Sequence, residues 1–389
     1  MHVGTANLFI WPRQKAIVRQ DGDQLLRISQ VPTPVPVIDL DVLGRNLQRV
    51  VETCQSYHVA YRPHVKTHKM AALARMQMDA GACGITCAKI GEAEVMADAG
   101  LQDIFISCCV VDRLRFERLA RLAQCCRMSV GVDSSQAAQA LSEFFSAHDQ
   151  SLDVLMEVDT GHHRCGVGPD DACDFAHFLV ALRGIRLKGI FTHEGHVYQP
   201  GSAEERFARA EEAGRRMARV ASILRERGTT TEVVSMGSSP AREGACRVAG
   251  VTENRPGTNI FNDCTQVHLG SCELSDCALS YECTVVSRPA SDRAVIDGGS
   301  KTFSSDQLSD WQGAGVVKGY PGAKFSRASE EHGILFLSDG RSQSLQVGDR
   351  VRVIPSHACG SINLHDRAFV EKNGEIVHEW KIEARGCVQ

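Results

Sequence analysis

The sequence has few aromatic residues, little net charge and no long apolar run. Of its 389 residues, 6% are Phe, Trp or Tyr, and the formal net charge is −4. A chain so close to neutral has no general attraction to nucleic acid or to a membrane surface, so we expect neither as a partner. No uncharged run reaches the roughly 18 apolar residues of a membrane helix, and residues 1–18 lack the apolar core of a signal peptide. We therefore predict a cytoplasmic protein.

Cysteine, in contrast, is abundant, with sixteen residues. Small secreted proteins use so many cysteines for disulfides, but in this long chain most of them fall within apolar runs. The adjacent pairs Cys108–Cys109 and Cys125–Cys126 are of this kind. We expect reduced, buried thiols.

The length and the order of the predicted elements indicate two domains, because single cores stop growing at roughly 250 to 300 residues. Between residues 35 and 250, short β-like runs alternate with helical patterns, the clearest of which covers residues 203–228. Eight such units favour an α/β fold with a closed parallel (β/α)8 barrel, the TIM barrel, over an open sheet. The strands are predicted at residues 36–40, 60–66, 84–89, 104–109, 128–132, 152–158, 187–192 and 232–236.

The C-terminal part of the chain has a pattern typical of a smaller β-rich domain. Runs separated by Gly, Asp and Ser predict strands at residues 281–287, 293–297, 333–337, 349–354 and 375–381. We therefore divide the chain into a barrel over residues 33–270 and a β domain formed by residues 1–32 together with residues 271–389.

Lys66 lies in the run RPHVKTHK at residues 62–69, where a predicted strand gives way to a helix. Barrel enzymes place their catalytic groups at such strand ends. A lysine desolvated there can form a Schiff base with a carbonyl, which is how pyridoxal 5'-phosphate (PLP) enzymes hold their cofactor. An ordinary solvated lysine at a helix start is the alternative. His64, in the same run, is a second candidate for contact with the cofactor.

A bound PLP also requires a phosphate site, which barrels build from backbone amides after their last strands. The run VSMGSSP at residues 234–240 ends the predicted eighth strand, and RPGTN at residues 255–259 follows it. Small residues in these runs allow the backbone to close on an anion, although either run alone also fits a polar turn. The candidate residues are Ser235, Gly237, Ser238, Gly257, Thr258 and Asn259.

Two other loops on the same face of the predicted barrel supply candidates for the cofactor ring. Arg164 follows the sixth strand, and its planar fork matches a phenolate or carboxylate oxygen. His193 and Glu194 end the seventh strand. A glutamate there could bond the pyridine nitrogen, while the histidine could stack on or bond the ring. A structural role for the histidine is an equal alternative.

His357 and Cys359 lie two residues apart at the end of a predicted strand, so their side chains are expected on one face. The pair suits a divalent ion, zinc most of all, with manganese and magnesium as alternatives. A buried cysteine beside a turn histidine is the other interpretation. His365 and Asp366 are candidates for an outer shell around the ion or for capping a turn.

Taken in order, these motifs resemble the family of D-serine dehydratases and D-threonine aldolases, metal-dependent relatives of alanine racemase among the fold-type III PLP enzymes. The resemblance runs from about residue 33 to the C-terminus. It rests on residues 38–41, 62–69, 87–89, 92–94, 157–159, 164–167, 235–240, 255–263, 297–301, 330–333 and 357–359. It implies a barrel with a C-terminal β domain and a head-to-tail homodimer whose active sites lie near the subunit interface.

The resemblance also assigns roles to individual residues. It implies Lys66 as the Schiff-base lysine and His357 with Cys359 as metal ligands. Around the phosphate it implies Gly237, Ser238, Gly257 and Thr258. Asn259 departs from the family pattern, which usually has tyrosine there.

Cys359 favours a dehydratase, because His-x-Cys resembles the dehydratase pattern of the family and His-x-Asp is more typical of the aldolases. We predict β-elimination from a 3-hydroxy D-amino acid, such as D-serine or D-threo-3-hydroxyaspartate, to a 2-oxo acid and ammonia. Lys66 would remove the Cα proton, and the metal would assist departure of the hydroxyl. Retro-aldol cleavage to glycine and an aldehyde is the alternative. A protein that binds PLP without turnover is a weaker one, since it would need no metal. A racemase ranks low, because no tyrosine lies in the expected motif.

Overall fold

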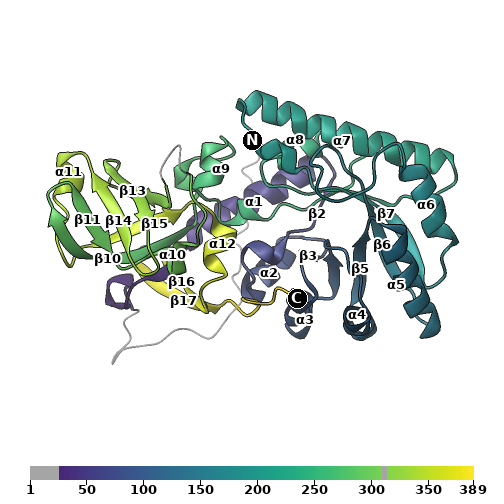
Figure 1. Ribbon diagram of the computed structural model, residues 1–389, viewed down its shortest axis with the longest axis horizontal. Coiled ribbons are helices and arrows are strands. Elements are labelled where there is room, and N and C mark those ends of the chain that lie inside the picture. Colours follow the sequence, from purple (N-terminus) through teal and green to yellow (C-terminus); the bar gives the residue numbers. More distant parts are fainter. Residues whose placement is uncertain (1–25, 309–312) are drawn as a thin grey trace, which may run out of the picture.

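The computed structural model describes residues 26–308 and 313–389. Figure 1 shows two lobes, one built around a parallel sheet with helices outside it and the other built mainly from antiparallel strands. One cluster of buried apolar side chains includes residues of both lobes, among them Leu73 and Phe303. The lobes therefore share a continuous core.

The parallel sheet has eight strands in the order β2-β9-β8-β7-β6-β5-β4-β3. They are β2 (Ala60–Tyr61), β3 (Ile85–Cys87), β4 (Asp103–Ile106), β5 (Arg127–Val132), β6 (Leu152–Glu157), β7 (Ile185–Phe191), β8 (Val233–Met236) and β9 (Glu253–Asn254). The two edges of this sheet meet through an isolated bridge between His64 and Thr86, where Thr86 N donates to Pro63 O over 2.8 Å. The predicted barrel is therefore confirmed, and its irregular seam lies two residues from Lys66.

Helices follow the strands and cover the outside of the barrel, as Figure 1 shows. They are α1 (Leu40–Ser56), α2 (Ala71–Asp79), α3 (Ile90–Asp98), α4 (Arg113–Cys125), α5 (Ser135–Ala147), α6 (Ala172–Ala181), α7 (Ala203–Glu226) and α8 (Arg242–Cys246). The long α7 confirms the predicted helix, and it begins with a capping box between Ser202 and Glu205. Across the described part of the chain, no helix combines the length and apolar character needed to cross a membrane.

The first predicted barrel strand belongs to the other lobe, which corrects the strand count. It is β1 (Val35–Asp39), and it pairs with β10 (Leu279–Ala290) and β16 (Arg367–Lys372) instead of with the barrel. The eighth barrel strand is β9, which the sequence prediction missed. A two-residue strand carries no periodicity, and an apolar run buried on both faces does not indicate which sheet it joins.

The second lobe contains a nine-stranded sheet in the order β11-β14-β13-β12-β15-β10-β1-β16-β17. Its other strands are β11 (Arg293–Ile296), β12 (Gly315–Val317), β13 (Ala323–Ala328), β14 (Gly333–Leu337), β15 (Arg350–Pro355) and β17 (Glu375–Lys381). Because β10 pairs with β15 and β11 in successive halves, the strands from β10 to β15 close into a ring. The five predicted strands are confirmed, whereas β12, β13 and β16 were missed. Short helices complete the lobe junction and the loops: α9 (Cys264–His268), α10 (Ser300–Phe303), α11 (Gly340–Gln343) and α12 (Ala358–Ile362).

Of the N-terminal residues predicted to join the β domain, only residues 26–32 lie within the described part of the chain. Arg27 forms an antiparallel bridge with Glu375 of β17, so this segment does contact the second lobe. The domain limits at residues 33 and 270 stay a prediction.

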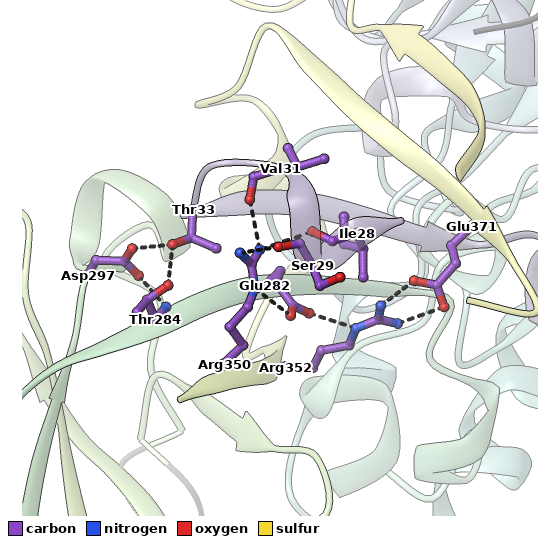
Figure 2. A network of polar contacts seen from close by, with 10 residues as sticks. All are labelled: Ile28, Ser29, Val31, Thr33, Glu282, Thr284, Asp297, Arg350, Arg352 and Glu371. Carbon is purple, nitrogen blue, oxygen red and sulfur yellow. Dashed lines mark hydrogen bonds and ion pairs between the residues drawn. The ribbon is translucent and has the colours of Figure 1, made fainter. Parts of the chain in front are cut away.

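Figure 2 shows the polar network that fastens this segment to the sheet. Glu282 on β10 accepts hydrogen bonds from Arg350 Nε over 3.1 Å and from Arg352 Nε over 2.8 Å, and Arg352 also pairs with Glu371. Arg350 donates to three backbone carbonyls, those of Ile28, Ser29 and Val31. The Glu282 carboxylate therefore compensates two arginines at once.

All sixteen cysteines are free, as predicted. Cys126 is buried and Cys109 is half-buried, but Cys108 and Cys125 are exposed, so their predicted burial is wrong. Cys125 is the last residue of α4, and Cys108 lies in the loop after β4. At the end of a helix or strand, an apolar run in the sequence does not predict which side chains are buried.

Replacing Glu282 by glutamine is expected to destabilise the second lobe by roughly 3 kcal/mol, because two partly buried arginines lose their counter-charge. Glu379→Gln is the matched control. It breaks the pair between Arg367 and Glu379, in which the arginine is 61% exposed, and should cost less than about 1 kcal/mol. Urea unfolding of both variants measures the difference, and equal midpoints would contradict this account of the network.

Candidate active site

A cavity of about 470 Å³ lies at the carboxyl ends of the barrel strands and receives residues from both lobes. Nine of the thirteen predicted site residues line it: His64, Lys66, His193, Gly237, Ser238, Gly257, Thr258, His357 and Cys359. The cavity thus brings the predicted lysine, the predicted phosphate loops and the predicted metal pair together, although they span about 290 positions of the sequence.

The segment that carries Lys66 is fixed on both sides of the lysine. Lys66 lies in the 3-10 turn η2 (Val65–Thr67), and the ring of His68 accepts a hydrogen bond from Met70 N at Nδ1 over 3.0 Å. Its other nitrogen must then donate to Gln77 Oε1, 3.2 Å away. Lys69 adopts a left-handed φ of 57°, and its buried ammonium pairs with Glu92 over 3.2 Å. The surrounding contacts hold this strained turn, and with it the position of Lys66.

Two histidines beside Lys66 are neutral. Burial, followed by the charges of Lys66 and Arg255, holds the pKa of His64 well below its ordinary value. Burial lowers the pKa of His193 to about 3. His193 Nδ1 lies 2.7 Å from Gly237 O, so this nitrogen carries the proton and Nε2 remains an acceptor. The two rings therefore add no positive charge to the cavity.

The two Gly-Ser runs form a surface suited to a phosphate group. Ser238 Oγ is buried and has no hydrogen-bond partner among the described residues. A Cβ at Gly257 would lie 2.8 Å from Thr67 Oγ1 and 3.0 Å from His64 O, so only glycine allows this close approach. Ser239 Oγ accepts from Gly257 N over 3.2 Å and thereby fixes one run against the other. An unpartnered hydroxyl on a side-chain-free cradle fits the phosphate of PLP.

Four predicted cofactor residues do not line the cavity. Ser235 Oγ donates to Glu253 over 2.6 Å and is fully buried. Glu194 accepts from Gly237 N over 3.0 Å, and burial raises its pKa to about 7. Asn259 is buried, and both polar atoms of its side chain lack a partner among the described residues. Arg164 is half exposed, 3.8 Å from Glu157. Their contacts with a cofactor stay predictions.

Arg255 lines the cavity, but no role was predicted for it beyond its place in the run RPGTN. Its buried guanidinium donates to Thr192 O and to Ser235 Oγ, each over 2.6 Å. The rings of Phe105 and Phe191 flank it, with centroids 5.5 and 5.2 Å from the guanidinium carbon. Arg255 directly follows β9 and precedes Pro256 and Gly257, which is the position of a site residue at a strand end. Because β9 was not predicted, this position was not recognised from the sequence.

His357 and Cys359 provide a nitrogen and a sulfur donor at the cavity wall. The charge of Cys359 is the main reason that the pKa of His357 rises to about 11. Burial by itself would raise the pKa of Cys359, but the charge and hydrogen bond of His357 outweigh it and lower that pKa to about 7. Cys359 Sγ lies 3.2 Å from Thr67 Oγ1 and 3.5 Å from Thr258 Oγ1. A thiolate beside an imidazole fits a borderline-soft ion such as zinc, which would displace the proton from the ring.

The predicted outer-shell residues of this pair lie elsewhere. His365 Nε2 is 3.0 Å from Thr302 O, and Asp366 pairs with Arg385. The carboxylate that reaches His357 belongs to Asp263 instead, with Oδ2 3.2 Å from Nδ1 of the ring. Proximity in sequence was therefore a poor guide to the contact.

A second group of potential metal ligands lies at the ends of β4, β5 and β6. The ligand atoms of Cys109, Asp133 and Glu157 all lie within 4.8 Å of one another. Cys109 donates to Asp133 over 3.2 Å, and Glu157 faces Arg164. Experiments on metal binding therefore need to distinguish this group from His357 and Cys359.

The fold and the site define an alanine racemase-like barrel protein with an additional β domain. Residues 38–264 match the alanine racemase N-terminal domain, and residues 278–371 match the putative serine dehydratase domain. The chain belongs to the family of D-serine dehydratases and D-threonine aldolases. D-threo-3-hydroxyaspartate dehydratase of Delftia sp. (strain HT23) is 35% identical over 364 residues, which are 87% of this chain and 93% of that protein.

Solved structures agree with this assignment. The crystal structure of D-threonine aldolase from Filomicrobium marinum has a TM-score of 0.87 and 33% identity, covering 94% of this chain and all of that one. A cysteine-to-alanine variant of D-threo-3-hydroxyaspartate dehydratase in its metal-free form has a TM-score of 0.86 and 33% identity, covering 91% and 98%. Because one is an aldolase and the other a dehydratase, the similarity alone does not choose between the reactions.

The stability of the barrel should depend on the protonation of Glu157. Burial raises the pKa of this carboxyl from 4.5 to about 7, so its stabilising contribution is complete below pH 4.5 and is lost as the pH rises through 7. The variant Glu157→Gln should therefore gain roughly 2–3 kcal/mol relative to the wild type between pH 5 and pH 8. Urea unfolding across this range measures the gain. For the exposed Glu232→Gln control the difference should stay within about 1 kcal/mol; a parallel response of both variants would contradict the assignment.

Proposed function

We propose that this protein is a PLP- and metal-dependent lyase that removes the 3-hydroxyl of a 3-hydroxy D-amino acid, giving a 2-oxo acid and ammonia. The observation that carries the proposal is the meeting of Lys66 with His357 and Cys359 in one cavity. A lysine that can hold PLP and a metal pair that can bind a hydroxyl are the two groups that such an elimination needs. The family, with its dehydratases of hydroxy D-amino acids, supports the same reaction.

The chain's own residues divide the work around the cofactor. PLP supplies an electron sink that stabilises negative charge at the substrate Cα. Lys66 would hold the cofactor and, once released by the substrate amine, would take the Cα proton at Nζ. Ser238 and the cradle at Gly257 would bind the phosphate. His64 and His193, being neutral, would leave the lysine free of further like charge.

His357 and Cys359 would hold the ion beside the substrate hydroxyl. We assign zinc, because the thiolate is a poorer ligand for manganese or magnesium than for zinc. The ion would supply a Lewis acid that stabilises the departing hydroxide. The hydroxyls of Thr67 and Thr258 would orient the sulfur toward the cavity.

Two properties of the whole molecule extend the proposal. The loop after β4 and the first turn of α4 expose Val111 by 59% and Leu114 by 74%, beside the barrel end that contains the cavity. Apolar surface at this place supports the homodimer, and light scattering at several concentrations would test it. The sixteen free cysteines support a reducing, cytoplasmic compartment.

A retro-aldol reaction is the second candidate, favoured by the high similarity to D-threonine aldolase over nearly the whole chain.

The two reactions can be distinguished by incubating the PLP- and zinc-loaded protein with D-serine, D-threonine and D-threo-3-hydroxyaspartate. We expect 2-oxo acid and ammonia. Glycine without 2-oxo acid would favour the aldolase, and no product from any of them would favour a PLP-binding protein without turnover.

Lys66→Ala should abolish both the activity and the covalent attachment of the cofactor, because no other lysine lines the cavity within the described residues. The wild-type protein should absorb near the edge of the visible range and be bleached by borohydride, whereas the variant should lack the reducible band. Lys188→Ala, in which an exposed ion pair with Glu232 is broken, is the control and should keep the band. A reducible band that survives in Lys66→Ala would refute the role of Lys66.

A further inference from the structure

Asp263 connects the two lobes directly behind His357. It follows the 3-10 turn η4 (Thr258–Ile260) and caps α9, which Figure 1 places near the junction of the lobes. Its side chain is fully buried, and Oδ1 accepts from Gln266 N over 2.9 Å, as an N-cap aspartate usually does. The second oxygen contacts the other lobe. Oδ2 accepts from Ala358 N over 2.9 Å and lies 3.2 Å from His357 Nδ1.

This contact determines which nitrogen of His357 can bind a metal. A carboxylate oxygen only accepts hydrogen bonds, so Nδ1 must carry the proton and Nε2 is the nitrogen left for a ligand. Since the same oxygen also holds Ala358 N, the ring and the adjoining backbone are fixed together. The side chain of His357 is 35% exposed and lines the cavity, whereas that of Asp263 is 0% exposed. The open edge of the ring therefore belongs to the cavity.

Asp263 is not a third ligand, because both of its oxygens are bonded and the residue is closed off from the cavity. We propose instead that Asp263 is a positioning residue, which holds Nδ1–H of His357 and presents Nε2 to the ion beside Cys359. The inference rests on the metal site of the proposed function. Loss of such a carboxylate contact typically weakens metal affinity 10- to 100-fold.

Two variants separate positioning from simple helix capping. Asp263→Asn keeps an oxygen that can accept from Gln266 N. Its amide NH2 group, however, is a donor and cannot accept from Nδ1–H of His357 or from Ala358 N–H. Asp263→Ser keeps a good N-cap and removes the contact with His357. Asp112→Asn is the matched control, because Asp112 caps α4 through Arg115 N over 3.0 Å and does not line the cavity. His357→Ala gives the effect of losing the ligand itself.

The measurement is the zinc dissociation constant of each PLP-loaded protein, obtained by competition with a chromophoric chelator. Asp263→Asn and Asp263→Ser should bind zinc 10- to 100-fold more weakly than wild type, and Asp112→Asn should bind it within about twofold. The ligand-field bands of bound cobalt, beyond the absorption of the cofactor, should change in the two Asp263 variants only. A capping defect alone would not move these bands. Thermal unfolding of the metal-free variants measures any loss of stability. If Asp263→Asn does not fold, the zinc affinity of Asp263→Ser is compared with that of the wild type instead.

The outcomes distinguish this inference from the proposed function. Wild-type affinity in both Asp263 variants, together with loss of zinc in His357→Ala, would overturn the role of Asp263 and leave the metal site intact. Unchanged affinity in His357→Ala would overturn both. In that case Cys109→Ala should show whether the ion lies instead at Cys109, Asp133 and Glu157.

Discussion

The contact between Cys359 and Thr67 is the interaction on which the candidate site depends. Cys359 comes from the second lobe, while Thr67 is the immediate neighbour of Lys66 in the barrel, and 3.2 Å separates the sulfur from the hydroxyl. Neither lobe contains a complete site by itself. The barrel supplies Lys66 and the two Gly-Ser runs, and the second lobe supplies His357 and Cys359. The relative position of the lobes therefore determines the distance between Lys66 and the pair formed by His357 and Cys359.

Burial sets the charges around Lys66. It keeps the imidazoles of His64 and His193 neutral and raises the pKa of Glu194 to about 7. Burial also favours the neutral form of His357, but the charge of the neighbouring Cys359 outweighs it and raises the pKa of His357 to about 11. Buried imidazoles thus reach different protonation states, because the one at His357 faces an anionic thiolate whereas those at His64 and His193 face a cationic lysine.

The sequence predicted the barrel, and it predicted that Lys66 and the two Gly-Ser runs lie at strand ends on one face of it. These predictions were possible because strand ends and Gly-Ser turns have local signatures. It did not predict β9, which is two residues long, or the contact of Asp263 with His357, which joins residues 94 positions apart. Glu194 illustrates a third kind of limit. Its position after β7 was correct, but its carboxylate bonds Gly237 N, and nothing local in the sequence specifies that partner. Local patterns thus locate loops on the correct face, and tertiary packing decides which atoms meet.

The place of β1 has a consequence for the order in which the molecule can assemble. β1 lies between β10 and β16, so the second lobe is made from the chain segments before and after the barrel. During synthesis on the ribosome, β1 has no strand to pair with until β10 and then β16 have been made. The barrel strands β2 to β9, in contrast, are synthesised as one uninterrupted stretch. His357 and Cys359 precede β16, so their lobe is finished only when the last strands have left the ribosome. The Gly-Ser runs of the barrel are therefore synthesised well before the proposed metal ligands His357 and Cys359 can be placed beside them.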